Sequence, residues 1–259
     1  MNQRVAIVTG GAQGIGRGIA ERLAQDGCAI AVWDQNADGA AEVAQALRDA
    51  GGPARSSEVD VSDSAQVRRA LDGLLAEWGR VDILVNNAGW DRLMPFLDSG
   101  EDHWDRVIGV VYRGTLNTCR YVGPRIVEAE HGRIVNIGSD TAKIGGPFEA
   151  VYSGAKGAVT SFSRALAREL AETGTTVNVV SPGSTDTPMF RRIEAELEVD
   201  PVFKSYFTEK LSESQAKRIP LGRLALPSDV ANAVAFFASE RTEFVTGQVL
   251  STSGGETMY

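Results

Sequence analysis

Short apolar runs alternate along the chain with longer segments in which apolar residues recur every three or four positions. The short runs are continuously apolar rather than alternating, which is typical of parallel strands buried on both faces. The longer segments predict helices that connect one strand to the next. We therefore expect an α/β fold, built as a doubly wound parallel sheet of seven strands. The predicted strands are Val5 to Thr9, Ala29 to Asp34, Ser57 to Val61, Ile83 to Asn86, Arg133 to Ile137, Val177 to Ser181 and Gln248 to Ser251.

One segment interrupts this alternation. Residues 188–221 are rich in charged and aromatic side chains, and the segment is longer than an ordinary connection within a domain. Long loops of this kind often carry function, so we predict a small helical lid over a substrate site. A surface excursion without a role is the alternative.

The composition is typical of a single globular domain, here residues 1–259. A formal net charge of -8 argues against nucleic-acid or membrane-surface partners, because both need a basic face. Cys28 and Cys119 lie outside any metal-ligand spacing, so we expect no metal site. The apolar stretches are too short for a signal peptide or a membrane span, which favours a cytoplasmic protein with a small-molecule partner.

A glycine-rich turn follows the first predicted strand and opens the first helix, with the sequence Thr9-Gly-Gly-Ala-Gln-Gly-Ile-Gly16. Glycines there permit close approach of the backbone to a pyrophosphate, and the free N–H groups of a helix start attract phosphates. The spacing differs from the GxGxxG pattern, and a turn of this kind without a ligand is the alternative. We predict a dinucleotide site that includes Gly10, Gln13, Gly14, Ile15 and Gly16.

Acidic residues after the second and third strands bear on the choice of cofactor. Asp34 closes the second strand, where a carboxylate binds the ribose hydroxyls of adenosine. Such a charge repels the 2′-phosphate of NADP, and neither Gln13 nor Gln35 supplies a cation to offset it. This indicates NAD. Asp60 and Val61 close the third strand and could flank the adenine, although the Asp60 carboxylate could equally belong to the turn that follows.

Two side chains four residues apart indicate acid–base chemistry. Tyr152 and Lys156 share one face of a predicted helix, and an ammonium group near a phenol can lower the pKa of that phenol. Ser139 follows the fifth strand, at the sheet edge where ligands bind, and could hold a substrate oxygen against Tyr152. Taken alone, such a Tyr-Lys pair is more often a surface pair. The dinucleotide turn upstream favours catalysis.

These motifs stand in the order and spacing of a known family. Asn86-Asn-Ala-Gly89, Ser139, Tyr152-Ser-Gly-Ala-Lys156 and Pro182-Gly183 together resemble the short-chain dehydrogenase/reductase family over essentially the whole chain. The resemblance implies a Rossmann fold and an NAD-dependent oxidoreductase. In it, Tyr152 exchanges the proton, Lys156 binds the nicotinamide ribose and tunes Tyr152, and Ser139 positions the carbonyl. It also implies a homotetramer, and further cofactor contacts at Asn87, Ala88, Gly89, Ile137, Pro182, Gly183, Thr185 and Thr187.

The resemblance fails at one position. The family usually carries an asparagine seven residues after a tryptophan, which is thought to hold a water that relays protons from the lysine. Here Val111 stands at that distance from Trp104, and its side chain makes no polar contacts. We therefore expect proton relay to use another route, or turnover to be impaired.

The implied activity is interconversion of a secondary alcohol and a ketone with NAD(H). A closer resemblance, carried by Trp90-Asp91, Ser139-Asp140 and Glu149-Ala-Val-Tyr152, is to members that act on cyclic or acyl-CoA substrates. One alternative is reduction of 3-oxoacyl groups on a carrier protein, which usually uses NADPH and is disfavoured by Asp34. The other is a catalytically silent NAD(H)-binding sensor, which the intact catalytic residues oppose.

Overall fold

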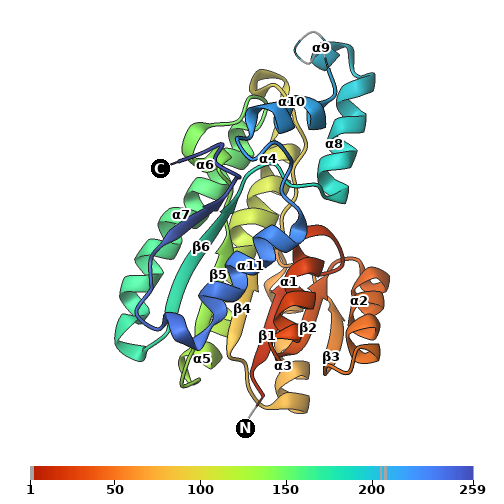
Figure 1. The fold of residues 1–259 in the computed structure, drawn as a ribbon. Helices are drawn as coiled ribbons and strands as arrows, with labels where there is room; N and C mark the ends of the chain where they lie inside the picture. Colours follow the sequence, from red (N-terminus) through yellow and green to blue (C-terminus); the bar gives the residue numbers. More distant parts are fainter. Residues whose placement is uncertain (1–2, 205, 207–208, 259) are drawn as a thin grey trace.

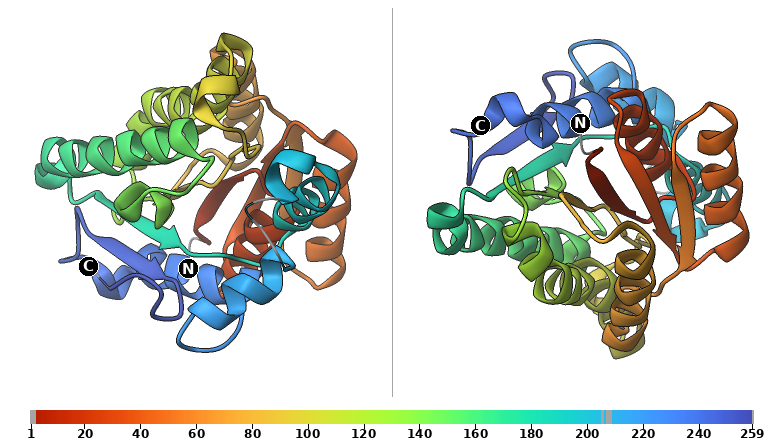
Figure 2. Two further views of the ribbon diagram at one scale, coloured as in Figure 1. Left: turned by 90° about the horizontal axis from the view of Figure 1, so that it is seen from above. Right: turned by 90° about the horizontal axis from the view of Figure 1, so that it is seen from below.

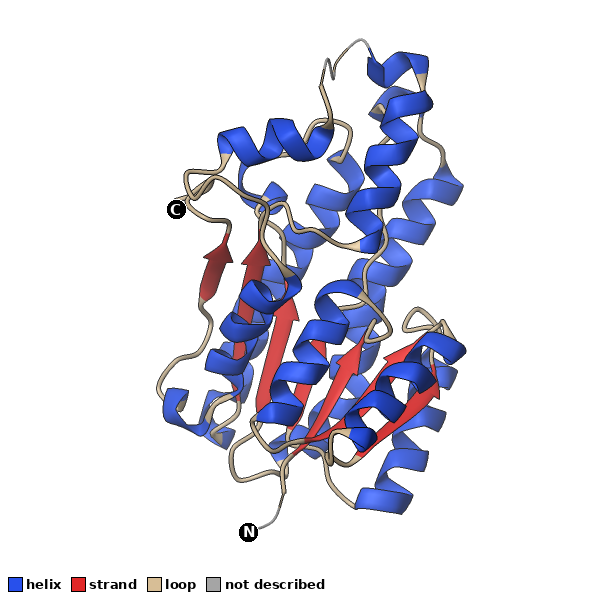
Figure 3. Cartoon of the chain, turned by 45° about the vertical axis from the view of Figure 1, so that its right-hand side comes forward, coloured by secondary structure: helices blue, strands red, loops and turns tan. Residues whose placement is uncertain are grey.

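A single parallel sheet organises the chain (Figures 1 and 3). The computed structural model describes residues 3–204, 206 and 209–258, and within them seven strands pair in the order β3-β2-β1-β4-β5-β6-β7. The doubly wound, seven-stranded parallel sheet predicted from the sequence is therefore confirmed. The strands are β1 (Val5–Thr9), β2 (Ala29–Asp34), β3 (Ala54–Glu58), β4 (Ile83–Asn86), β5 (Arg133–Ile137), β6 (Thr176–Pro182) and β7 (Val249–Thr252).

The position of β3 differs from the prediction. The strand comprises Ala54–Glu58, not 57–61, because it lies at the edge of the sheet and its own side chains are mostly half-buried and polar. Val59 and Val61, the apolar residues that suggested a strand, come after it and are buried in the core. An apolar pair in a loop that packs on the core looks like a strand in the sequence.

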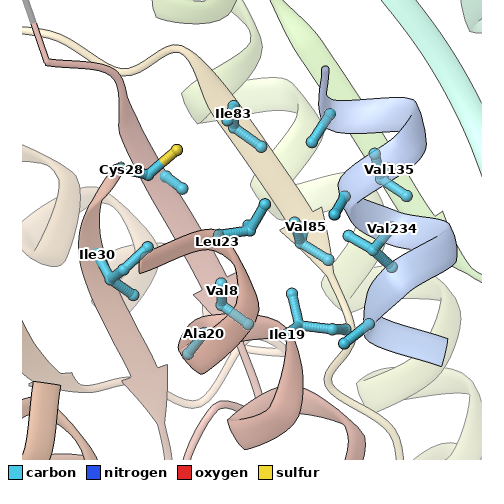
Figure 4. Packing of buried hydrophobic residues seen from close by; sticks show 14 of the residues in the cluster. Val8, Ile19, Ala20, Leu23, Cys28, Ile30, Ile83, Val85, Val135 and Val234 are labelled. Carbon is cyan, nitrogen blue, oxygen red and sulfur yellow. The ribbon is translucent and has the colours of Figure 1, made fainter. Parts of the chain in front are cut away.

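Helices cover both faces of the sheet (Figure 2). Alternate residues of β1 point to opposite faces, so Ala6 and Val8 join one apolar cluster while Val5 and Ile7 join the other. Figure 4 shows the first cluster, in which α1 and α11 contribute Leu23 and Val234. The flanking helices are α1 (Gly14–Gln25), α2 (Ala37–Asp49) and α11 (Pro227–Ala238) on one face, and α3 (Ser64–Trp78), α5 (Gly114–Val127) and α7 (Ala150–Leu170) on the other.

Segment 188–221 forms short helices beyond the carboxyl ends of the strands (Figure 1). It contains α8 (Pro188–Val199), α9 (Pro201–Lys204) and α10 (Leu211–Arg218), and residues 205, 207 and 208 of the segment lie outside the described residues. The remaining elements are short: α4 (Glu101–Ile108), a π-helical turn (Gly109–Arg113), α6 (Thr141–Ile144) and the 3₁₀ turns Phe96–Asp98, Ala171–Thr173 and Glu240–Thr242. Across the described part of the chain, no helix has the length and apolar character to cross a membrane.

The strand order positions the functional site. The chain winds outward from β1 to β3 and then returns to β4 on the other side of β1. The loops that follow β1 and β4 therefore diverge at the carboxyl edge of the sheet, and such a switch point is where doubly wound sheets bind ligands.

Candidate active site

A cavity of about 690 Å³ opens at this switch point. The loops after β1, β2, β4, β5 and β6 line it, together with the first turns of α7 and with α8 and α10 from segment 188–221. Every residue that the sequence assigned to catalysis or to the cofactor lines this one cavity. Among the described residues, no group of three or more His, Cys, Asp and Glu side chains is arranged to hold a metal ion.

The glycine-rich turn is shaped for a close backbone approach. Gly10 and Gly14 have φ angles of 62° and 54°, in the left-handed region that favours glycine. At Gly16 an added Cβ would lie 2.0 Å from the carbonyl oxygen of Gly10. The first N–H groups of α1 therefore reach the cavity without intervening side chains, and the turn fits the pyrophosphate of a dinucleotide.

The Asp34 carboxylate is fixed beside this turn. One of its oxygens accepts a hydrogen bond from the N–H of Ala12 at 3.0 Å, and the other accepts one from the N–H of Asn36 at 2.9 Å. The carboxylate lines the cavity at the end of β2. An anion held in this place fits ribose hydroxyls and disfavours a phosphate in the same position.

Several predicted cofactor residues hold the loops that form the site. The side-chain amide of Asn87 donates to the carbonyl oxygens of Thr9 and Gly10, which ties the loop after β4 to the glycine-rich turn. The Asp60 carboxylate accepts from both the N–H and the hydroxyl of Ser62, so it holds the turn that follows it, and it also lines the cavity, where contact with an adenine stays a prediction. Thr187 caps α8 by accepting from the N–H of Phe190 at 3.1 Å.

The catalytic candidates come together from β5 and α7. Lys156 is buried, and its Nζ donates to the carbonyl oxygen of Ile137 at 2.7 Å. That Nζ lies 5.6 Å from the centre of the Tyr152 ring. The Ser139 hydroxyl faces the same cavity and lies 2.9 Å from the hydroxyl of Thr141. Next to it, Asp140 is buried and accepts a hydrogen bond from Ser251, which ties the loop after β5 to β7.

The electrostatics of Tyr152 correct one expectation. Burial raises the pKa of Tyr152, and the nearby carboxyl groups of Asp91 and Glu149 raise it further. Burial also lowers the pKa of Lys156 to about 8, which weakens the cation expected to act on the phenol. The pKa of Tyr152 therefore lies above, not below, its ordinary value. Helical spacing relates only Lys156 to Tyr152, because Asp91 comes from the loop after β4 and Glu149 lies just before α7 begins.

Asp91 and Glu149 form a carboxyl pair to which the sequence assigned no role. Burial raises the pKa of Asp91 to about 6, whereas burial and the charge of Asp91 raise the pKa of Glu149 to about 8. Two carboxylates in contact strongly resist double ionisation, so the pair shares one proton near neutral pH. Their short polar motifs, Trp90-Asp91 and Glu149-Ala-Val-Tyr152, were the signal that could have pointed to them.

This pair should make stability depend on pH. The pKa of Glu149 in the folded protein lies above its unfolded value of 4.5, so its contribution is complete below about pH 4.5 and is lost as pH rises through about 8. Glu149→Gln removes that loss. The unfolding midpoint of the variant should match wild type at low pH and exceed it by several degrees above pH 8, at about 2–4 °C per kcal/mol. Thermal unfolding at a series of pH values measures this, with the exposed-acid variant Glu101→Gln as control. A difference that does not change with pH would contradict it.

Val111 lies in an apolar cluster under Tyr152. It is 1% exposed within the π-helical turn and packs with Val107, Ala155 and Val159. The π-helical turn leaves the Val111 carbonyl oxygen free to accept a hydrogen bond from the Thr115 hydroxyl at 2.8 Å. The missing asparagine is thus replaced by apolar packing, with no polar side chain in that place.

Segment 188–221 contacts Asp91 and the residue that precedes Glu149. From α8, Arg192 donates to the carbonyl oxygen of Asp91 at 2.6 Å. Phe148, which precedes Glu149, packs edge-on against Phe203 at 5.1 Å. Phe148 has a φ of 66°, a strained conformation for a bulky residue, which costs on the order of 1–3 kcal/mol and is typical of functional sites.

Comparison with known proteins agrees with this site. The family described as enoyl-(acyl carrier protein) reductase matches residues 10–257. The chain is 37% identical to a cis-4-hydroxycyclohexanecarboxylate dehydrogenase of Sinomonas cyclohexanicum, over 98% of this chain and 97% of that one. It is 36% identical to a (2S)-[(R)-hydroxy(phenyl)methyl]succinyl-CoA dehydrogenase subunit of Thauera aromatica, over 100% of this chain and 98% of that one. A crystal structure of 3-ketoacyl-(acyl-carrier-protein) reductase from Brucella melitensis, complexed with NADH, superimposes with a TM-score of 0.87 at 31% identity, over 98% of both chains.

The fold and the site thus define an oxidoreductase with a dinucleotide-binding sheet and a Ser-Tyr-Lys constellation at its carboxyl edge. The chain belongs to the short-chain dehydrogenase/reductase family, and the expectation from the sequence motifs is confirmed.

Proposed function

We propose that this chain interconverts a secondary alcohol and a ketone with NAD(H), using Tyr152 as the proton-transfer residue. One observation carries the proposal: Ser139, Tyr152 and Lys156 share a single cavity with the glycine-rich turn and Asp34. Bound NAD(H) supplies or accepts the hydride in such a site. The relative solved with NADH supports the choice of this cofactor.

The residues around Tyr152 suit the reduction direction. The raised pKa keeps the phenol protonated, so Tyr152 can donate a proton to the developing alkoxide. The Ser139 hydroxyl can hold the same oxygen by a hydrogen bond. Lys156, anchored on the Ile137 carbonyl, directs its remaining N–H groups toward the cavity, where the nicotinamide ribose would lie.

The substrate is a cyclic or acyl-CoA compound, such as 2-hydroxycyclohexanecarboxyl-CoA. The relatives named for a cyclohexanecarboxylate and for a succinyl-CoA derivative support this class. Arg192 and Arg218 line the cavity from α8 and α10, where they could contact the phosphates of CoA. Apolar side chains line the rest of the substrate half: Trp90, Leu93, Ile144, Met189, Phe190, Ile193 and Leu211.

Reduction of 3-oxoacyl groups on an acyl carrier protein is the second candidate. The Brucella relative bears that name and was solved with NADH, so the presence of Asp34 does not by itself separate the two substrates. A silent NAD(H)-binding sensor is less well supported, because the three catalytic side chains are present and lie in one cavity.

Steady-state turnover tests the proposal. The protein is assayed with NADH against 2-oxocyclohexanecarboxyl-CoA, simple cyclic ketones and a 3-oxoacyl carrier protein. We expect NADH oxidation, fastest with the cyclic CoA ester. Preference for the carrier protein would select the second candidate, and tight NADH binding without turnover on any ketone would select the sensor.

We further propose a homotetramer. Val230 and Val234 of α11 fill the core, but Phe236 of the same helix is 52% exposed and Phe244, in the loop before β7, is 101% exposed. Exposed apolar groups beside an edge strand favour association between copies. Sedimentation velocity at micromolar concentration should show a tetramer that Phe244→Lys weakens. A stable wild-type monomer would exclude the tetramer.

The cytoplasmic location expected from the sequence stays a prediction.

A further inference from the structure

Asp91 and Glu149 have no part in the reaction as proposed so far, yet they line the cavity beside Tyr152. Asp91 follows β4 and is 2% exposed, and its carboxyl group interacts with the Glu149 carboxyl group and with the backbone N–H of Arg92. Arg192 is the cation that α8 brings close, and it bonds to the backbone oxygen of Asp91. Burying a carboxylate beside a second carboxyl group is costly unless a function maintains the pair.

Glu149 is placed to act on Tyr152. It immediately precedes α7, three residues before Tyr152, and its carboxyl group lines the same cavity as Tyr152 and Lys156. Gly146 leaves room for the Glu149 carboxyl group, because a Cβ there would lie 1.9 Å from Oε2. The position of this carboxyl therefore depends on a glycine in the neighbouring loop.

The other side of Tyr152 is closed to protons. Its ring packs on the apolar cluster of Val107, Val111, Ala155 and Val159, whose side chains neither donate nor accept protons. The acid pair, in contrast, lies in a cavity that opens to solvent. The pair and Tyr152 line the same cavity, so the pair can take a proton from solvent and pass it to the phenol.

We propose that Asp91 and Glu149 act together as the proton donor that restores Tyr152 after each ketone reduction. This inference rests on the proposed function. Once the phenol has given its proton to the substrate oxygen, the O–H bond of Glu149 breaks and a new O–H bond forms on the phenolate oxygen of Tyr152. The pair, now doubly negative, takes one proton from solvent and returns to its singly protonated state.

The surrounding charges favour this direction. Lys156 from α7 and Arg192 from α8 face Asp91 and lower its pKa relative to burial alone, which leaves Glu149 as the more basic member of the pair. The pKa of Tyr152 is raised above that of Glu149, so transfer from Glu149 to the phenolate runs toward the stronger base. Two adjacent carboxylates repel each other, which drives uptake of the next proton.

The first test compares Glu149→Gln with wild type in ketone reduction. We expect kcat to fall on the order of tenfold, less than the ~10²–10⁴-fold contribution of direct proton transfer. The solvent isotope effect on kcat should rise, the decline of kcat above pH 8 should become shallower, and NADH affinity should stay within a factor of about two. Glu149→Asp should restore part of the loss, which a merely structural role would not explain.

A second variant displaces the carboxyl without removing it. Gly146→Ala places a Cβ against Glu149 and should reproduce the kinetic effects of Glu149→Gln. Gly154→Ala is the matched control, because a Cβ there meets nothing within 4 Å. Val111→Asn should not raise kcat if the pair supplies the proton. A rise would assign the relay to the helix side of Tyr152 and overturn the inference.

Two outcomes separate this inference from the proposed function. If wild type turns over and Glu149→Gln and Gly146→Ala leave kcat, its pH profile and the isotope effect unchanged, the inference fails alone. If wild type reduces no ketone, the function fails, and Tyr152 is titrated in cofactor-free protein by tyrosinate absorbance, with Tyr152→Phe as the blank. Asp91→Asn and Glu149→Gln should then lower the pKa of Tyr152, and an unchanged titration overturns the pair as its proton partner.

Discussion

Replacing Tyr152 with phenylalanine should lower kcat by about 10³-fold while leaving the Kd for NADH nearly unchanged, because only the proton-transfer group is removed. The ring of Tyr152 packs on the cluster around Val111, and phenylalanine keeps that packing. The fold and the glycine-rich turn should therefore be unaffected. Single-turnover rates of NADH oxidation, together with NADH fluorescence titration, separate the chemical step from binding.

The control for this variant is Tyr121→Phe, the same chemical change on α5 outside the residues that line the cavity. It should retain wild-type activity. Lys156→Ala should behave differently from Tyr152→Phe and weaken both kcat and NADH binding, since it removes a buried cation at the site and leaves the Ile137 carbonyl without its donor. Wild-type turnover by Tyr152→Phe would show that another group transfers the proton.

NADH should bind on the order of 100-fold more tightly than NADPH, a difference of about 2.8 kcal/mol. The reason is the fixed Asp34 carboxylate, which two backbone N–H groups hold at the edge of the cavity. A 2′-phosphate placed near it would meet a like charge in a partly buried site. Fluorescence titration with both cofactors measures the gap directly.

Asp34→Ala should narrow the difference in affinity between NADH and NADPH mainly by weakening NADH binding. The ribose loses its acceptor, and the backbone N–H groups of Ala12 and Asn36 lose theirs. Asp38→Ala removes the same charge four residues away, from an exposed position in α2, and should leave the preference intact. Equal affinities for the two cofactors in wild type would refute the NAD assignment.

The pattern of the sequence was enough to predict the sheet and the location of the site. Continuous apolar runs with helical spacers specify parallel strands covered on both faces, and the glycine-rich turn marks the switch point. Tyr152 and Lys156 share a helix face through spacing alone. These features are local, because strand, turn and helix each depend on residues close together in the chain. The prediction misplaced only the edge strand β3, because the apolar residues after this strand belong to a loop that packs on the core.

Tertiary structure alone decided the electrostatics of the site. Asp91 lies in the loop after β4 and Glu149 precedes α7, and no spacing rule connects them. The fold places both carboxyl groups beside Tyr152, which reverses the expected direction of the pKa shift of Tyr152. The fold also surrounds Val111 with apolar side chains on one side of Tyr152. The side chains of Asn87 and Asp60 hydrogen-bond to neighbouring loops and hold them in place. A pKa and a proton path depend on burial and on charges from distant segments, and these exist only once the chain has folded.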